Sequence, residues 1–600
     1  MVLQTKTFLS AILMSLIKSN IEGAAVQGVT WYIRRFMPYL KPDLWRMVLN
    51  IAVIICMTLS SAAIIWMVGR GFDLLHNGRF DALPTYFLLV AALVAGVQLL
   101  RYANIYLYEW MEQRIIYAIR RKLYAHLLLL STPFKTHYAT GDLLTRLAQD
   151  IYRISQLLVL IPGNLFSNGL TLVIYVVALM LIDLRLTLVA LTLLPLFWLH
   201  QHYFSARTRV SSYAFLDYQG KMSAFEEVSL TNIQGINSFN AEPLVLKRFD
   251  YLFGGFRRAA MRDLLLNHAF VVSFSMLSAL CAIVLVSLGT QAIGNGELTM
   301  GGLVNFLLYA GYLAVPLQNI ATVPVESQIR VAAAARVAVI LDTVPSVVER
   351  KSAQTLNKVV GRVRFAEVGF SYADSAPVLN NFSLDIQPGE FIAIVGPSGA
   401  GKSTLARLLL RFYDPTMGAI YLDEHDLRDL NLASLRSHLA VVWQEPFLLD
   451  DTIRANLMLA DPNASEMELY SAARDAQAHE FIDKLPLGYD TLLGAQGARL
   501  SSGQKQRLAI AQVLLKKSSL LIFDEATSAL DAQSERDLQH ALAVVRRGRT
   551  TIIIAHRYAT VKSADRIVYL NSDGSVQVGT HAQLSQHHAG YREALAHQQL

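Results

Sequence analysis

The chain has 600 residues, of which 53% are hydrophobic and only 16% are charged, and its mean hydropathy is +0.36. Ordinary soluble domains carry roughly 25% charged residues, so this composition argues against a wholly soluble protein and favours a membrane part joined to a soluble one. The net charge of +7 does not indicate nucleic-acid binding, because the excess lies in links between apolar runs, as membrane orientation requires.

The N-terminal segment, residues 1–43, precedes the first long apolar run. Residues 31–40 mix aromatic, basic and apolar side chains, which predicts an interfacial "elbow" helix on the inner membrane surface. Phe8–Ile17 is apolar but too short to span a membrane. A signal peptide is not expected, because no clean small-residue cleavage site follows.

Six apolar runs follow, and each is close to the about 20 residues that a helix needs to cross the hydrocarbon core. Buried core helices are the alternative, but six such runs in one half of a chain favour membrane spans. We therefore predict a transmembrane domain from residue 44 to residue 342. The fourth run is the weakest, because Pro195 interrupts it. The runs are Leu44–Val68, Thr85–Tyr108, Ser155–Ile182, Leu186–Phe204, Leu264–Leu288 and Leu298–Val323.

Two long polar links, between the second and third runs and between the fourth and fifth, carry most of the basic residues of this half. The positive-inside rule places both links, and therefore both termini, in the cytoplasm. Each link has helical character and is predicted to extend two membrane helices on the order of 30 Å beyond the bilayer. Their tips are predicted at Phe134–Asp150 and Asn232–Asn240.

The sixth run carries a polar and aromatic stripe, with Asn305, Tyr309, Tyr312 and Pro316 on one helix face. A polar group facing lipid is costly, so Asn305 is expected to point to the protein interior or to a watery cavity. In one interpretation the stripe lines a path for an amphipathic solute. In the other, Asn305 forms a hydrogen bond across the helix bundle.

A polar linker, residues 343–360, leads to a second domain, residues 361–600, which begins with a predicted strand at Val363–Phe370. Within it, the apolar strand Phe391–Val395 runs into a glycine loop and then a helix, the context that a phosphate-binding loop needs. Its glycines let backbone N–H groups face phosphate oxygens, Lys402 is expected to reach the β and γ phosphates, and Ser403 to ligate Mg²⁺. The loop residues are Gly396, Pro397, Ser398, Gly399, Ala400, Gly401, Lys402, Ser403 and Thr404.

Two further buried strands end in candidate catalytic residues. Leu520–Phe523 leads into Asp524 and Glu525, which suit a Mg²⁺-linked carboxylate and a general base for the attacking water. The strand at residues 551–555 ends at His556, in a position where a lone histidine is either structural or a sensor of the γ-phosphate.

The segment Leu500-Ser-Ser-Gly-Gln504 lies between the phosphate loop and the acidic pair, and L-S-x-G-Q belongs to the ABC ATPases. With this ordered set of motifs the chain resembles, over nearly all its length, a bacterial ABC half-transporter of the exporter type. The resemblance implies six transmembrane helices with long cytoplasmic helical loops, fused to an α/β P-loop ATPase domain. The loop tips then resemble the coupling helices of that family.

The resemblance also implies ATP and Mg²⁺ as cofactors and further site residues. Gln444 resembles the glutamine that links nucleotide and metal to the membrane domain, and His556 resembles the switch histidine. Tyr372 resembles the aromatic residue that stacks on adenine, although it can also be a strand-packing tyrosine. The signature residues expected to contact ATP of the opposite subunit are Ser501, Gly503 and Gln504.

Two residues depart from the family pattern. Ser502 stands where the signature normally has its first glycine, and Ala495 stands where exporters often have glutamate. Because serine restricts the backbone more than glycine does, we expect Ser502 to weaken the site without abolishing it.

The predicted function is ATP-hydrolysis-driven transport of an amphipathic or lipid-like solute across the bacterial cytoplasmic (inner) membrane. The partners expected are a second half-transporter, either a copy of this chain or a paralogue, and membrane lipid. The layout most resembles lipid and multidrug flippases. Siderophore or peptide transport, including import, and a membrane ATPase that regulates without transporting remain alternatives.

Overall fold

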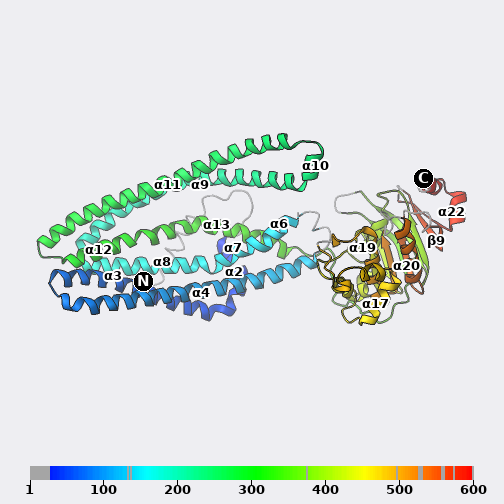
Figure 1. Ribbon diagram of the computed structural model, residues 1–600, viewed down its shortest axis with the longest axis horizontal. Coiled ribbons are helices and arrows are strands. Elements are labelled where there is room, and N and C mark those ends of the chain that lie inside the picture. Colours follow the sequence, from blue (N-terminus) through cyan, green and yellow to red (C-terminus); the bar gives the residue numbers. More distant parts are fainter. Residues whose placement is uncertain are drawn as a thin grey trace. The chain divides into compact units, whose positions relative to one another are not determined.

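The computed structural model describes residues 28–130, 134, 138, 140–372, 376–494, 497–524, 532–555, 561–571 and 574–596. The chain divides into two compact units. The first extends to Ala125 and continues from Gly141 to Asp342; the second comprises His126–Thr140 and Thr343–Leu600. Helices build the first unit, and the second unit contains the sheets (Figure 1).

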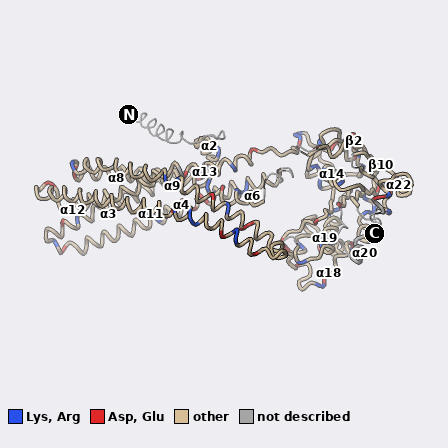
Figure 2. Tube along the Cα trace, turned by 90° about the horizontal axis from the view of Figure 1, so that it is seen from above, with Lys and Arg blue, Asp and Glu red and all other residues tan. Residues whose placement is uncertain are grey.

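The first unit confirms the predicted spans, because six helical stretches among the described residues are long and apolar enough to cross a membrane. Charged residues are sparse around α3, α8 and α12 and frequent along the extension of α4 (Figure 2). The main helices are α2 (Val29–Leu40), α3 (Leu44–His76), α4 (Leu83–Leu129), α8 (Leu160–Ile182), α9 (Leu184–Thr231), α11 (Glu242–Gly294), α12 (Met300–Tyr312) and α13 (Ala314–Asp342).

The predicted long links are continuous with the membrane helices. α9 passes through Pro195 without a break and is joined to α11 by the short helix α10 (Ile233–Ser238), as predicted for the second tip. α6 (Thr140–Thr145), a π-helical turn (Arg146–Asp150) and α7 (Ile151–Leu158) precede α8. Of the first predicted tip, Phe134–Asp150, residues 135–137 and 139 lie outside the described residues, and its larger part forms α6 and the π-helical turn.

The contact between α3 and α12 relies on two glycines and one asparagine. Gly69 and Gly301 face each other so closely that a Cβ atom on either would overlap the other's carbonyl oxygen. The Asn305 side chain accepts a hydrogen bond from the Gly69 N–H at 2.9 Å and donates one to the Trp66 carbonyl at 3.3 Å. Small residues thus allow the close backbone approach that membrane helices use in place of hydrophobic burial.

The stripe on the sixth run is therefore mainly a packing surface. Asn305 and Tyr309 are 6% and 3% exposed, and the Tyr309 hydroxyl donates to the Ala62 carbonyl at 2.6 Å. The substrate-path interpretation is wrong for these two residues, and the hydrogen-bonded packing alternative is confirmed. Tyr312 is 55% exposed and is the last residue of α12. Leu313 alone separates α12 from α13.

The second unit contains two sheets. The four-stranded antiparallel sheet has the order β2-β1-β4-β5, and the six-stranded sheet has the order β10-β9-β3-β8-β7-β6. The strands are β1 (Val363–Phe370), β2 (Leu379–Ile386), β3 (Phe391–Val395), β4 (Met417–Leu422), β5 (His425–Asp426), β6 (Leu439–Val442), β7 (Leu520–Asp524), β8 (Thr550–Ile554), β9 (Arg566–Leu570) and β10 (Val576–Gly579).

Helices cover the six-stranded sheet, and every residue of β3, β7 and β8 is buried. Such continuous apolar strands are typical of a parallel sheet covered on both faces. The helices are α14 (Lys402–Leu409), α15 (Leu432–Ser437), α16 (Ile453–Met458), α17 (Glu466–Asp475), α18 (His479–Asp483), α19 (Ser502–Leu515), α20 (Ala532–Val545), α22 (His581–His587) and α23 (Ala589–Ala596).

Candidate nucleotide site

The candidate site lies at the carboxyl edge of the six-stranded sheet. β3, β8, β7 and β6 are parallel neighbours, so their carboxyl ends meet at one edge. This edge holds the phosphate loop after β3, Gln444 shortly after β6, and Asp524 at the end of β7. Asp524 pairs with Ile554, two residues before His556. Glu525 and His556 themselves lie outside the described residues.

The phosphate loop depends on backbone conformations that favour glycine. Gly399 has φ +85°, and Gly401, which precedes α14, has φ +94°. A Cβ atom at Gly401 would lie 2.9 Å from Cγ1 of Val378, so both conformation and space select glycine there. The loop thereby leads directly into the N-terminus of α14, where the backbone N–H groups of the first turn and the helix dipole favour binding of an anion.

Lys402 is buried, and its Nζ donates hydrogen bonds to the carbonyl oxygens of Gly396 at 2.8 Å and Pro397 at 2.9 Å. The ammonium group is therefore held against the loop. Ser403 Oγ donates to Asp524 Oδ1 at 3.0 Å, which joins the start of α14 to the end of β7. This hydroxyl and this carboxylate are hard oxygen ligands of the kind Mg²⁺ takes alongside nucleotide phosphates, so they fit the predicted metal.

Tyr372 lies beside the first turn of α14. Its hydroxyl is 3.0 Å from Thr404 Oγ1 and accepts a hydrogen bond from Arg407 at 3.2 Å. Its ring packs edge-on against Phe370 and Tyr413, with centroids 4.9 Å and 5.2 Å away. The residue therefore packs on its strand as one alternative expected, and it also adjoins the phosphate loop, so adenine stacking stays a prediction.

Gln444 is exposed in the bend that follows β6. Its amide is thus available at the carboxyl edge, and two strands, β8 and β7, lie between β6 and the strand β3 that leads into the phosphate loop. An assignment to a metal or to the attacking water stays a prediction.

The signature segment forms the N-terminus of α19. The Ser501 hydroxyl accepts from the Gln504 N–H at 3.3 Å, and the Gln504 side chain accepts from the Ser501 N–H at 3.0 Å, which makes a capping box. Ser502 is the first helical residue and does not have a positive φ. This position therefore needs no glycine-specific conformation, and the expected weakening of the site by Ser502 stays a prediction.

Two family profiles match the chain. The "ABC transporter transmembrane region" profile matches residues 47–317, and the "ABC transporter" profile matches residues 379–528. YgaD of Bacillus subtilis, assigned by name to multidrug export as an ATP-binding/permease protein, is 32% identical over 95% of this chain and 99% of its own. The chain belongs to the ABC transporter family.

Further comparisons agree with this family. A Staphylococcus aureus (strain NCTC 8325) protein, also assigned by name to multidrug export, is 34% identical over 82% of this transporter and 86% of its own chain. The solved structure of a bacterial Atm1-family ABC exporter with ATP bound has a TM-score of 0.77 at 28% identity, covering 93% of this chain and 99% of that one. The predicted family, exporter fold, ATP binding and ATP-driven membrane transport are thereby confirmed.

Sequence reasoning missed three contributors to the transporter's site. Val378 restricts Gly401, Arg407 bonds to the Tyr372 hydroxyl, and Tyr413 packs on the Tyr372 ring. No local pattern marks Val378 or Tyr413, because their contacts come from the folded sheets. The capping role of Ser501 could have been found, since S-x-x-Q before an apolar run is a helix-start signal.

Proposed function

We propose that this ABC transporter exports an amphipathic or lipid-like solute across the bacterial cytoplasmic membrane. The observation that carries the proposal is a cavity of about 420 Å³ lined by α9, α11, α12 and α13. It lies within the apolar runs that cross the membrane. The names of the relatives, which assign them to multidrug export, support the direction and the class of solute.

The cavity has the lining expected for an amphipathic ligand. Phe197, Trp198 and Phe274 supply aromatic surface, and Gln201 and Gln318 supply amide groups among otherwise mainly apolar residues. Apolar walls with a few polar groups are typical of small-molecule sites. None of the described residues that line it is charged, which makes a simple inorganic ion a poor substrate.

The ATPase roles follow from the edge of the sheet. Ser403, Gln444 and Asp524 would hold Mg²⁺, which would stabilise negative charge on the phosphates when bound. Support comes from the 3.0 Å contact between Ser403 and Asp524. Lys402 would bind the phosphates, Glu525 would accept the proton of the attacking water, and His556 would sense the γ-phosphate.

The working unit would be a dimer of half-transporters. The chain has one phosphate loop and one signature, and Ser501 and Ser502 at the start of α19 are exposed, where a partner's nucleotide could reach them.

The basic long links support a cytoplasmic ATPase domain and cytoplasmic termini. We assign the N-terminal segment to residues 1–43, the membrane domain to 44–342, the linker to 343–360 and the ATPase domain to 361–600.

The test is ATP-dependent flux of a fluorescent amphipathic dye in proteoliposomes, with ATPase activity measured in parallel. Ala282→Trp places a large ring in the cavity, and Ala92→Trp places the same ring on an exposed face of α4. We expect Ala282→Trp alone to reduce flux and dye-stimulated ATPase activity while unstimulated activity persists. Equal flux in both variants, or ATP hydrolysis without flux of any amphipathic dye, would contradict the proposed transport and favour a regulatory ATPase.

A further inference from the structure

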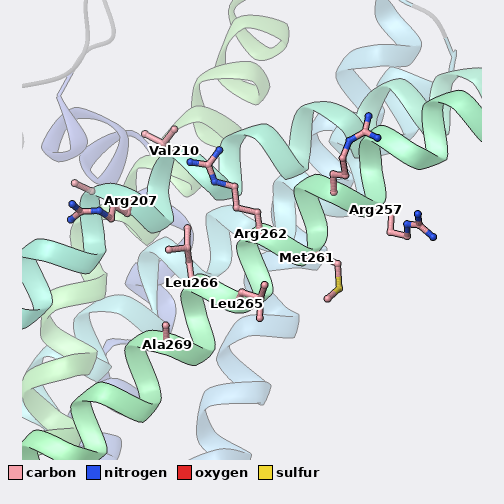
Figure 3. Close-up of a pocket in the computed structure, with 10 residues that line it drawn as sticks. Arg207, Val210, Arg257, Met261, Arg262, Leu265, Leu266 and Ala269 are labelled. Atoms are coloured by element: carbon pink, nitrogen blue, oxygen red, sulfur yellow. The ribbon is translucent and has the colours of Figure 1, made fainter.

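A second hollow, of about 1090 Å³, lies along the seam of α9 and α11 (Figure 3). It shares no lining residue with the apolar cavity. Four of its lining residues are arginines, Arg207 on α9 and Arg257, Arg258 and Arg262 on α11. In Figure 3 the Arg262 side chain extends from α11 toward Val210 of α9. We call this hollow the arginine groove.

The arginine groove lies where apolar and polar parts of both helices meet. On α11, Arg258, Arg262, Leu266 and Ala269 recur at three- or four-residue spacing on one face, over a length of about 18 Å from Arg257 to Ala269. The leucines of the groove follow Arg262 at the start of the fifth apolar run. Arg207 comes just after the fourth apolar run. The groove therefore offers cations and apolar surface side by side at a membrane boundary.

The three arginines that α11 contributes to the groove are not paired with acidic side chains among the described residues. Arg257, Arg258 and Arg262 form no ion pair with any residue in the described part of the chain. Asp263, their sequence neighbour, accepts hydrogen bonds from Ser212 at 2.7 Å and Asn267 at 3.1 Å. On α9, Asp217 is the first acidic residue after Arg207 in the sequence, and it forms an ion pair with Lys221 at 2.6 Å.

Arg207 is held in place by its own helix. Its guanidinium lies over the Tyr203 ring, 3.6 Å from the centroid, and donates to the Tyr203 carbonyl at 3.0 Å. Its remaining N–H groups can still bind an anion. A guanidinium presents paired donors that match phosphate, whereas neither a neutral solute nor a cation would be drawn to four of them.

We infer that the arginine groove binds the phosphate headgroup of an anionic membrane phospholipid, with an acyl chain against Leu265 and Leu266. A bilayer lipid fits better than free phosphate, because the groove joins its cations to an apolar wall that free phosphate does not need. Clustered basic residues next to a membrane span attract anionic lipid at about 1 kcal/mol each, which is about fivefold in affinity. The placement of the groove at the inner leaflet relies on the orientation proposed above.

The test is direct binding to the purified full-length transporter, counted as bound lipids by native mass spectrometry. The probes are short-chain phosphatidylglycerol, phosphatidylcholine of the same chain length, and inorganic phosphate. The groove variant is Arg257→Gln with Arg258→Gln and Arg262→Gln. The control is Arg209→Gln with Lys247→Gln and Arg248→Gln, which removes the same charge from exposed positions of the same helices outside the groove.

We expect wild type to prefer phosphatidylglycerol to phosphatidylcholine, with a preference that falls as salt rises. The groove variant should bind phosphatidylglycerol about 100-fold more weakly, and the control variant should stay within about threefold of wild type. Should the groove variant fold poorly, the corresponding triple lysine variant keeps the charge and should retain phosphatidylglycerol preference over phosphatidylcholine.

Equal binding of both lipids by wild type, or equal losses in the groove and control variants, would overturn the inference. Full displacement of lipid by inorganic phosphate at matched concentration would assign the groove to a free anion instead. A disulfide between two copies through Arg262→Cys in membranes would show that the groove is covered by a second subunit. Because binding needs neither ATP nor transport, its failure is distinguishable from failure of the proposed export.

Discussion

Replacing Gly301 by alanine tests the α3–α12 contact. A Cβ atom at this position would lie 2.7 Å from Oδ1 of Asp73 and closer still to the Gly69 carbonyl oxygen. Carbon–oxygen contacts need about 3.3 Å, so the two helices must separate by at least about 0.6 Å. Because the Gly69 carbonyl oxygen is nearer than Asp73 Oδ1, the separation exceeds this value. The Asn305 bond to Trp66, now 3.3 Å long, would then pass about 3.9 Å, the bond to Gly69, now 2.9 Å, would pass about 3.5 Å, and both would break.

Hydrogen bonds between membrane helices contribute about 0.6 kcal/mol on average and about 1.7 at most, so losing two costs roughly 1–3 kcal/mol. The matched control is Gly311→Ala on the same helix, where a Cβ atom meets nothing within 4 Å. Both changes gain the same helix propensity, about 1 kcal/mol, so the difference between them isolates the contact. We expect Gly301→Ala to unfold at a lower SDS fraction than Gly311→Ala. Coincident unfolding curves would refute the packing argument.

Three smaller predictions concern the ATPase domain. Ser502→Gly should leave ATPase activity unchanged or raised, because the position is helical in backbone, and a steep loss would show that the hydroxyl acts at the nucleotide. Tyr372→Leu should weaken ATP binding in equilibrium titration, whereas Tyr372→Phe, which keeps the ring and loses only the hydroxyl bonds to Thr404 and Arg407, should bind nearly as wild type; equal losses would argue against stacking. Hydrogen bonding from Arg362 lowers the pKa of Asp385, so their pairing stabilises the fold above about pH 4 and is lost as pH falls through that lowered pKa. Arg362→Gln should therefore lower the unfolding midpoint at pH 7 and lower it by less as the pH falls below about 4, and a pH-independent difference would contradict this.

Elements with strong local signals were predictable from the sequence. The predicted strands at Val363–Phe370 and Phe391–Val395 coincide with β1 and β3. Alternation of apolar and polar residues indicates β1, continuous apolar residues indicate β3, and Gly401 specifies the turn into α14 through its conformation. The six spans were equally readable, because length and apolar composition alone decide whether a helix can cross a bilayer.

Features that depend on distant partners were not predictable. The role of Asn305 could not be chosen from the sequence, because its partner Gly69 is on another helix. The apolar cavity and the arginine groove depend on how α9 and α11 are aligned with each other. The His200–Ser273 and Ser212–Asp263 hydrogen bonds show this alignment, and the periodicity of the sequence does not specify it. The helical backbone of Ser502 could not be read from the signature, because comparison with a motif says nothing of the φ angle that a position adopts.

Glu525→Gln in the reconstituted transporter tests the central claim most directly, that ATP hydrolysis in the second unit drives transport through the first. The change removes the proposed base while keeping Asp524, Ser403 and the phosphate loop. A positioned base contributes about 10²–10⁴-fold, so hydrolysis and ATP-dependent dye flux should fall together by at least about 100-fold while ATP still binds. Retention of more than about a tenth of wild-type turnover, or flux that persists without hydrolysis, would contradict the account.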